Sequence, residues 1–288
     1  MLPADTSPLI SPEELHDRLE DRSIRVCDVR WYLGQPDRGR EEYEGSHIPG
    51  AIFIDLATDL AAATGAGRHP LPDPPTFAAR LAELGIGDEH EVVAYDDTGG
   101  TTASRLWWMV DDLGHAAVRV LDGGYKAWLD AGFEVETAAP AYPPAALRLA
   151  SEWRKVVDRE ALRGQLGRIT LLDARAGERY RGEVEPVDPL PGHIPTAISA
   201  PTAANLGPNG RMLPAAELRK RYSILCGPGR STVSSCGSGV TACHNALAMR
   251  VAGLPDPILY PGSYSDWSTA GERVASGPEP GAAELPRS

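Results

Sequence analysis

A cysteine followed by a glycine-rich turn is the clearest candidate for chemistry in this sequence. Cys236 comes after the short run 231–235 and before Gly-Ser-Gly-Val-Thr-Ala, and residues 243–249 then follow a helical pattern. The glycines let the backbone curl so that successive N–H groups point at the cysteine sulfur, and the helix adds its positive amino-terminal end. Because such a nest favours an anion, the pattern predicts a nucleophilic thiolate at Cys236 that can also hold a persulfide.

The remaining cysteines do not indicate a metal site. Cys27 lies inside an apolar run and Cys243 among apolar helical neighbours, so we expect both to be buried and structural. The spacing of Cys226, Cys236 and Cys243 contains no paired Cys-x-x-Cys, so neither a metal nor a cofactor is expected. Four cysteines in 288 residues make no disulfide scaffold, and the first residues lack a secretory pattern, so the expected location is the cytoplasm.

The first half of the chain contains a matching loop that lacks the cysteine. There the apolar run 91–95 is followed by Asp96-Asp-Thr-Gly-Gly. An aspartate cannot accept a sulfur atom and pass it on. We therefore expect the first half to be catalytically silent and to serve as a wall of the site or as structural support.

The sequence repeats itself once. Asp28-Val-Arg is echoed by Asp173-Ala-Arg, and His47-Ile-Pro-Gly-Ala by His193-Ile-Pro-Thr-Ala, with paired motifs about 138 to 146 positions apart. A period this long indicates a duplicated domain rather than a solenoid. The predicted parts are a silent domain (1–137), a Pro- and Ala-rich linker (138–147), a catalytic domain (148–276) and a flexible tail (277–288).

Short apolar runs alternate with helical patterns in each half. In the first half, 91–95 and 118–121 are predicted to be strands, and 103–113 and 125–131 helices. This alternation predicts an α/β fold with two tandem domains, each a mostly parallel sheet flanked by helices. Sites in such sheets lie at the carboxyl ends of strands, where Cys236 is expected.

The composition argues against two classes of partner. With 28 basic and 40 acidic side chains, the formal net charge is −12, which argues against nucleic-acid binding through bulk positive charge. No apolar run approaches the roughly 18 residues of a membrane span. Residues 1–144 hold 11 basic and 26 acidic side chains, whereas residues 145–288 hold 17 and 14. The second half is therefore mildly basic, which suits an anionic substrate.

Together these features resemble the rhodanese superfamily in its tandem form, with one silent and one catalytic domain. Tyr43-Glu-Gly-Ser-His-Ile-Pro-Gly-Ala, Ala103-Ser-Arg-Leu-Trp-Trp-Met and the Asp122-Gly-Gly motif match patterns of that family, over about residues 8–270. The loop at Cys236 is similar to that of 3-mercaptopyruvate sulfurtransferases, whereas thiosulfate-using members carry Arg and Lys directly after the cysteine. The resemblance implies a monoanionic donor, 3-mercaptopyruvate, because a dianion would require those two cations.

The resemblance also implies a covalent mechanism. The Cys236 thiolate takes the sulfur of a small anionic donor, pyruvate leaves, and the persulfide passes its outer sulfur to a thiol, cyanide or a thioredoxin-like protein. Ser238 is implied in proton handling, and His69 is implied to reach the site from the first domain. Arg179 is implied to bind the donor carboxylate. The loop residues implied in substrate binding are Gly237, Gly239, Val240 and Thr241.

Two positions differ from the family pattern. Asp188 stands where a second carboxylate-binding arginine is expected, and its charge would repel the donor unless it points away or Arg181 takes that part. Ala57 stands where an acidic partner of the catalytic histidine is expected, with Asp55 and Asp59 close in sequence. These differences leave the preferred donor open between 3-mercaptopyruvate and thiosulfate.

Two rival functions would use the same loop at Cys236. A cysteine phosphatase needs Cys-x5-Arg, but Ala242 stands at the arginine position. A non-catalytic rhodanese-like binding module would keep the motifs without the chemistry.

His47 and His193 are expected to be structural, because the silent half keeps its copy, and to bind the nearby Asp28 or Asp173.

Overall fold

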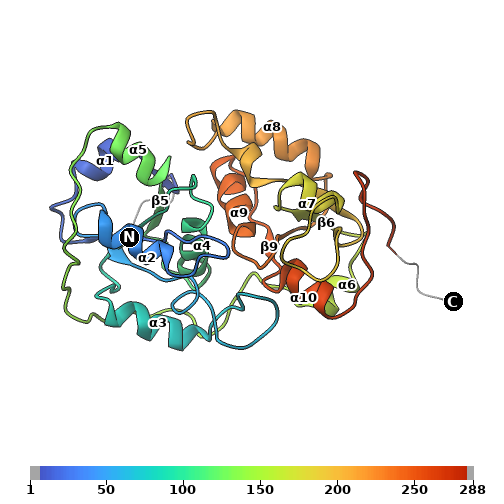
Figure 1. Cartoon of the computed structure of the whole chain (residues 1–288), viewed down its shortest axis with the longest axis horizontal. Helices are drawn as coiled ribbons and strands as arrows, with labels where there is room; N and C mark the ends of the chain where they lie inside the picture. Colours follow the sequence, from blue (N-terminus) through green and yellow to red (C-terminus); the bar gives the residue numbers. More distant parts are fainter. Residues whose placement is uncertain (1–6, 284–288) are drawn as a thin grey trace. The chain divides into compact units, whose positions relative to one another are not determined.

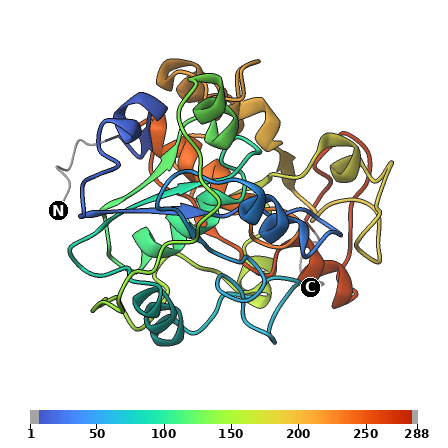
Figure 2. The same cartoon turned by 60° about the vertical axis from the view of Figure 1, so that its left-hand side comes forward.

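The computed structural model describes residues 7–283, which form two compact units (Figures 1 and 2). Each unit contains one parallel sheet with helices packed against it, so the predicted α/β class with two tandem domains is confirmed. Two short segments belong to a different unit from the residues that flank them in the sequence: 64–70 belongs to unit 2, and 206–212 belongs to unit 1. Unit 1 comprises residues up to 63, 71–154 and 206–212, and unit 2 comprises 64–70, 155–205 and the residues from 213 onward.

The sheet of unit 1 has five parallel strands in the order β1-β5-β4-β2-β3. Its three central strands are buried along their whole length, as a sheet covered on both faces requires. β4 and β5 coincide with the two predicted strands. The strands are β1 (Leu9–Ile10), β2 (Ile24–Asp28), β3 (Ile52–Phe53), β4 (Glu91–Tyr95) and β5 (Val118–Leu121).

Five helices cover this sheet. Leu15, Tyr43 and Trp128 bring three of them, α1, α2 and α5, onto one core. After the edge strand β3, the chain returns across the sheet through β4 and β5. Right-handed crossovers in this reversed direction place α3 and α4 on the face opposite to α1, α2 and α5. The helices are α1 (Pro12–His16), α2 (Arg38–Gly45), α3 (Pro74–Glu83), α4 (Ala103–Asp112) and α5 (Gly124–Asp130).

The sheet of unit 2 repeats this plan with four parallel strands in the order β7-β6-β8-β9. These strands correspond in sequence to β3, β2, β4 and β5. Val156 takes the place of the first strand through a single parallel bridge to Leu259. The strands are β6 (Thr170–Asp173), β7 (Ala197–Ser199), β8 (Thr232–Ser235) and β9 (Ile258–Leu259).

The helices of unit 2 repeat the plan as well. Leu162, Tyr180 and Trp267 bring α6, α7 and α10 onto one core, and α8 and α9 lie on the other side of the sheet (Figure 1). No helix among residues 7–283 has the length and apolar composition to cross a membrane. The helices are α6 (Arg159–Arg163), α7 (Gly177–Arg181), the 3-10 helix η1 (Thr202–Asn205), α8 (Ala215–Leu225), α9 (Ala242–Val251) and α10 (Ser263–Thr269).

The segment expected to be a linker, 138–147, contains neither helix nor strand and runs along unit 1. The Tyr142 hydroxyl donates to the carbonyl of Gly50 at 3.0 Å. The Arg25 guanidinium lies 4.1 Å from the centre of the Tyr142 ring. This stretch is therefore an extended strap attached to unit 1 by specific contacts.

The described part of the expected tail is attached to unit 2. The N–H of Gly277 donates to the carbonyl of Arg181 at 2.9 Å, and the carbonyl of Pro280 accepts from Thr196. Gly277 and Pro280 are thus held by hydrogen bonds to residues far away in sequence. Positions 284–288 of the expected tail lie outside the described residues.

The repeated histidines are structural, but their expected partners are wrong. Nδ1 of His47 lies 2.7 Å from the carbonyl oxygen of Tyr43, and Nδ1 of His193 lies 2.7 Å from that of Tyr180. Each imidazole also stacks on the ring of the same tyrosine. The expected aspartates are taken by arginines two positions later, Asp28 by Arg30 and Asp173 by Arg175.

Candidate active site

Cys236 lies at the carboxyl end of β8, in the loop that leads to α9. It is 2% exposed. Its N–H donates to Oγ of Ser263 at 3.0 Å, and its carbonyl accepts from the N–H of Tyr264 at 2.9 Å. Because both partners are in the first turn of α10, the loop and that helix are held in one fixed register.

β8 is unusually polar for a buried strand, and its two buried serine hydroxyls are both hydrogen-bonded. Oγ of Ser234 donates to the carbonyl of Ala242 at 2.9 Å, and Oγ of Ser235 donates to that of Leu172 at 3.0 Å. Buried hydroxyls are costly only when they lack a partner. These two bonds tie the candidate loop to the start of α9 on one side and to β6 on the other.

Gly239 is required by the shape of the loop. Its φ angle is +73°, a left-handed conformation that side chains disfavour. A Cβ atom there would come within 2.3 Å of the carbonyl oxygen of Pro261. Only glycine allows the loop to turn this close to the segment before α10.

The corresponding loop of unit 1 has an anion at its centre. Asp96 replaces the cysteine, and its carboxylate is fully buried. Oδ1 accepts from the N–H groups of Thr98 and Gly100, both at 2.8 Å, and Oδ2 accepts from those of Thr102 at 2.7 Å and Ala103 at 2.9 Å. Four backbone N–H groups therefore surround one carboxylate that belongs to the loop itself.

The loop of unit 2 occupies the same place in its sheet as the loop of Asp96. Asp96 and Cys236 each follow the strand at the same place in the sheet and precede the helix that covers it. The carbonyl of Asp96 accepts from Tyr125 at 2.7 Å, as that of Cys236 accepts from Tyr264. By this correspondence, the N–H groups of Ser238, Val240 and Ala242 are the counterparts of three of the four that surround the Asp96 carboxylate, whereas the N–H of Cys243 donates to the carbonyl of Val240 at 3.1 Å.

The structure brings His69 and Ser238 together. Nδ1 of His69 lies 2.8 Å from Oγ of Ser238. The histidine is delivered by the segment 64–70, which belongs to unit 2. Its neighbour Arg68 donates its N–H to Oγ of Ser265 at 3.0 Å, so the segment is bound to α10.

Two arginines converge on Gly237, directly after the candidate nucleophile. A Cβ atom at Gly237 would lie 3.1 Å from Nη2 of Arg68 and 3.5 Å from Nη1 of Arg179. The sequence indicated Arg179 but not Arg68. Two guanidinium groups next to Cys236 provide the positive charge that an anionic donor needs.

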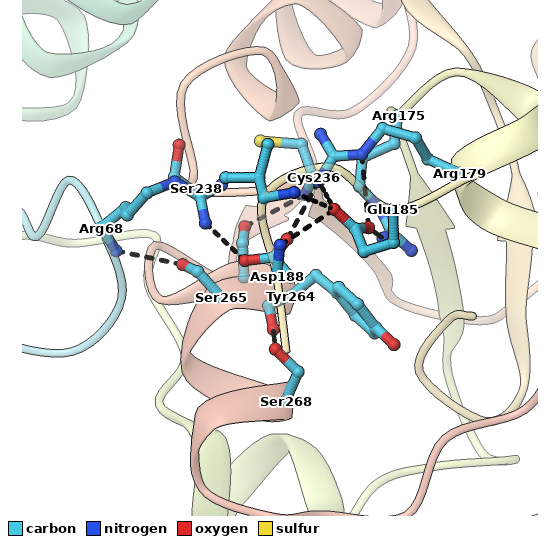
Figure 3. A network of polar contacts seen from close by, with 12 residues as sticks. Arg68, Arg175, Arg179, Glu185, Asp188, Cys236, Ser238, Tyr264, Ser265 and Ser268 are labelled. Carbon is cyan, nitrogen blue, oxygen red and sulfur yellow. Dashed lines mark hydrogen bonds and ion pairs between the residues drawn. The ribbon is translucent and has the colours of Figure 1, made fainter. Parts of the chain in front are cut away.

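Two buried carboxylates hold these arginines in place (Figure 3). Asp188 binds Nη1 of Arg68 with one oxygen and accepts from Nη2 of Arg179 at 3.0 Å with the other. Glu185 accepts from Nη2 of Arg179 at 2.7 Å and from its Nε at 3.3 Å. Asp188 is therefore paired with two cations.

Glu185 is stabilised in its charged form. Burial alone would raise the pKa of its carboxyl group, but hydrogen bonds from Arg179 and from the N–H groups of Asp188 and Val187 outweigh burial. The pKa of Glu185 consequently lies below its ordinary value. The carboxylate stays ionised and keeps Arg179 oriented toward Gly237.

Other residues considered from the sequence are engaged elsewhere. Arg181 pairs with Glu183 through two contacts of 2.7 Å, on the exposed side of α7. In unit 1, Asp59 accepts from Nε of Arg80 at 2.8 Å, and Asp55 accepts from the N–H of Ala57 at 2.7 Å.

Sequence reasoning missed three residues of the site. They are Arg68, Glu185 and Ser263. Only Arg68, next to His69 in the sequence, carried a signal that could have been used.

The other cysteines differ from Cys236 in their surroundings. Cys27 and Cys243 are fully buried, as predicted. Burial strongly raises the pKa of the Cys27 thiol, and it also raises that of Cys226, which is half-buried. Both thiols are therefore held in the protonated, less nucleophilic form.

Comparison with known proteins agrees with this architecture. The family model of the rhodanese-like domain matches residues 11–131 and 158–270. A Pseudomonas aeruginosa protein named "Probable 3-mercaptopyruvate sulfurtransferase" is 43% identical over 281 residues, covering 94% of this chain and 99% of that protein. Rat thiosulfate sulfurtransferase is 35% identical over 258 residues, covering 85% of each chain. The structure of 3-mercaptopyruvate sulfurtransferase from Leishmania major superposes with a TM-score of 0.82 at 31% identity, covering 93% of this chain and 76% of that one.

Proposed function

Because the chain belongs to the rhodanese-like domain family and is a sulfurtransferase, we propose that it moves sulfur from 3-mercaptopyruvate to a thiol or cyanide through a persulfide on Cys236. The observation that carries this proposal is the amide cradle around Asp96. In unit 2 the matching loop begins with a cysteine. The terminal sulfur of a Cys236 persulfide is an anion of the kind that such a cradle stabilises.

The first half-reaction transfers sulfur to the protein. The Cys236 thiolate attacks the donor sulfur, an S–S bond forms, and the C–S bond breaks with its electron pair moving to the pyruvate enolate. A proton then converts the enolate to pyruvate. The contact between His69 and Ser238 supports a role for this pair in moving the donor thiol proton to the enolate.

The second half-reaction returns the cysteine to its starting form. A thiolate or cyanide attacks the outer sulfur, the S–S bond breaks, and the electron pair stays on the Cys236 sulfur as the thiolate. A thioredoxin-like protein would act as such a thiol acceptor. Unit 1, with Asp96 in place of the cysteine, takes no part in the sulfur relay. This is covalent catalysis in two steps, for which ping-pong kinetics are expected.

Thiosulfate is the second candidate donor, and one observation favours it. Arg68 and Arg179 put two guanidinium groups beside Gly237, although the loop itself carries no cation after the cysteine. The buried carboxylates of Asp188 and Glu185 offset those charges, which supports the monoanion 3-mercaptopyruvate instead. A side-by-side comparison of kcat/KM for the two donors decides between them.

The proposal is tested by the mass of the protein after exposure to donor. Wild-type protein is treated with 3-mercaptopyruvate or thiosulfate, freed of small molecules and measured by intact mass spectrometry. We expect a gain of one sulfur atom in the wild type and in a Cys226→Ser control, and none in Cys236→Ser. Sulfur gained equally by Cys236→Ser would refute the nucleophile. No gain in any variant would favour a non-catalytic binding module.

A further inference from the structure

We propose that Arg68 is the second donor-binding cation of this site, and that Asp188 fixes it there and makes the site discriminate against dianionic donors. The inference rests on the proposed function, because it names the donors that this site accepts. It assigns opposite tasks to two residues that touch each other. Arg68 attracts the donor, and Asp188 limits how much charge the donor can carry.

The hydrogen-bond pattern leaves two donor atoms facing the same point. Asp188 binds Nη1 of Arg68, while Asp188 and Glu185 together take Nη2 and Nε of Arg179. The atoms that remain, Nη2 of Arg68 and Nη1 of Arg179, are the two that come nearest to a Cβ position at Gly237. Two N–H donors from separate guanidinium groups can bind the two oxygens of one carboxylate or sulfonate group.

Arg68 carries a second sign that a ligand is expected. Its Nε atom is buried and has no hydrogen-bond partner among residues 7–283. Buried donors of this kind are rare in folded proteins, because leaving them unpaired is costly.

The charges around the site are balanced. Three arginines, Arg68, Arg175 and Arg179, face three carboxylates, and Asp188 is the one that binds both arginines directed at Gly237. The repulsion between Asp188 and a donor grows with the charge on the donor, so a dianion is penalised more than a monoanion. An arginine at position 188 would reverse this preference, whereas the aspartate sets it toward a single charge.

The test measures binding without reaction. In a Cys236→Ser background, which lacks the proposed nucleophile, 3-mercaptopyruvate and thiosulfate are titrated separately into the full-length protein by isothermal calorimetry. The variants added to this background are Arg68→Gln, Asp188→Asn and, as a matched control, Arg181→Gln. Arg181 is on the same helix as Arg179 but is paired with Glu183 away from the site. Thermal unfolding of each variant shows whether it is folded.

We expect Arg68→Gln to weaken both donors about tenfold, because a charge-assisted hydrogen bond is lost. We expect Asp188→Asn to favour thiosulfate, raising its affinity at least about fivefold more than that of 3-mercaptopyruvate. The control should stay within about twofold of its parent for both donors. Unchanged binding in Arg68→Gln would overturn the role of Arg68. An equal effect of Asp188→Asn on both donors would overturn the discrimination.

Failure of this inference differs from failure of the proposed function. If Cys236 is not the nucleophile, the mass test shows no sulfur on it, yet the pattern of affinities in the Cys236→Ser background can still be measured. If Cys236 is the nucleophile but the inference is wrong, sulfur loading occurs while the Asp188→Asn variant leaves the ratio of the two affinities unchanged. Asparagine has nearly the same shape as aspartate but gives up one acceptor oxygen, so some loss of stability is expected, and the thermal unfolding of Asp188→Asn shows that binding is measured on folded protein.

Discussion

Replacing Asp96 with asparagine should destabilise unit 1 far more than a change of one atom in a side chain ordinarily does. Each carboxylate oxygen of Asp96 accepts two backbone N–H groups at 2.7–2.9 Å. In asparagine one of these oxygens becomes an NH2 group, which cannot accept a hydrogen bond. Two backbone N–H groups then face another donor in a fully buried place.

The magnitude follows from the number of bonds affected. A hydrogen bond to a charged group is worth about 1.5–3 kcal/mol, and two are lost, so the expected loss is about 3–6 kcal/mol. Ordinary domains are stable by only about 5–15 kcal/mol, so unit 1 should unfold at a clearly lower urea concentration. The glutamine or alanine replacements would also change volume, which is why asparagine is the sharper probe.

The assay is urea unfolding followed by far-UV circular dichroism, with Asp130→Asn as the control. Asp130 pairs with Lys126 at 2.7 Å on the surface of the same unit, where both side chains are more than half exposed. An exposed pair of this kind contributes about 0–1 kcal/mol. The free energy of unfolding should therefore fall several times more in Asp96→Asn than in Asp130→Asn.

Equal destabilisation of the two variants would refute the reasoning. It would mean that the four N–H groups around Asp96 have no particular preference for an anion. The Asp96 cradle would then give no reason to expect a stabilised anionic sulfur on Cys236, even if sulfur transfer were measured. Sulfur transfer by itself does not show what stabilises the persulfide.

Two further predictions concern unit 2. Ser263 has a φ of +52°, and its hydroxyl accepts a hydrogen bond from the N–H of Cys236. Ser263→Ala should therefore lower kcat about two- to tenfold, which is the worth of one neutral hydrogen bond. It should also lower the thermal midpoint more than Ser263→Gly does, because glycine tolerates that φ. Unchanged kcat in both variants would contradict a positioning role. Glu185 has a folded-state pKa below its unfolded value of about 4.3, so its stabilising effect is present above that pH and is lost as the pH falls through the lower, folded pKa. Glu185→Gln should be less stable than wild type at pH 7, with the difference shrinking in urea titrations below about pH 4; a difference that grows on acidification would contradict the assignment.

The sequence located several elements of unit 1 directly. Strands β4 and β5 were predicted at their observed residues, and α4 and α5 within one residue, because apolar runs and helical patterns are local properties. The duplication was visible for the same reason, since each repeat keeps its own motifs. The position of Cys236 at the end of a strand followed from the glycine-rich turn after it.

The sequence did not reveal the hydrogen-bond partners of buried polar groups. His47 and His193 were expected to bind aspartates that are close in the motif, but the arginine two positions after each aspartate takes it in a forked pair. The histidines bind the carbonyls of tyrosines instead. A buried polar group takes the partner that the fold brings nearest, and several candidates lie within a few residues in the sequence.

The charge of the site was decided by the tertiary structure alone. From the sequence, Asp188 was an isolated negative charge at a position where a cation was expected. In the folded chain it binds Arg68, 120 positions earlier, and Arg179. The path of the segment 64–70 has no periodicity from which it could be predicted, because an irregular loop is fixed by the surfaces it meets rather than by its own pattern. The sequence thus determined which residue is the candidate nucleophile, and only the tertiary structure determined the charges that surround it.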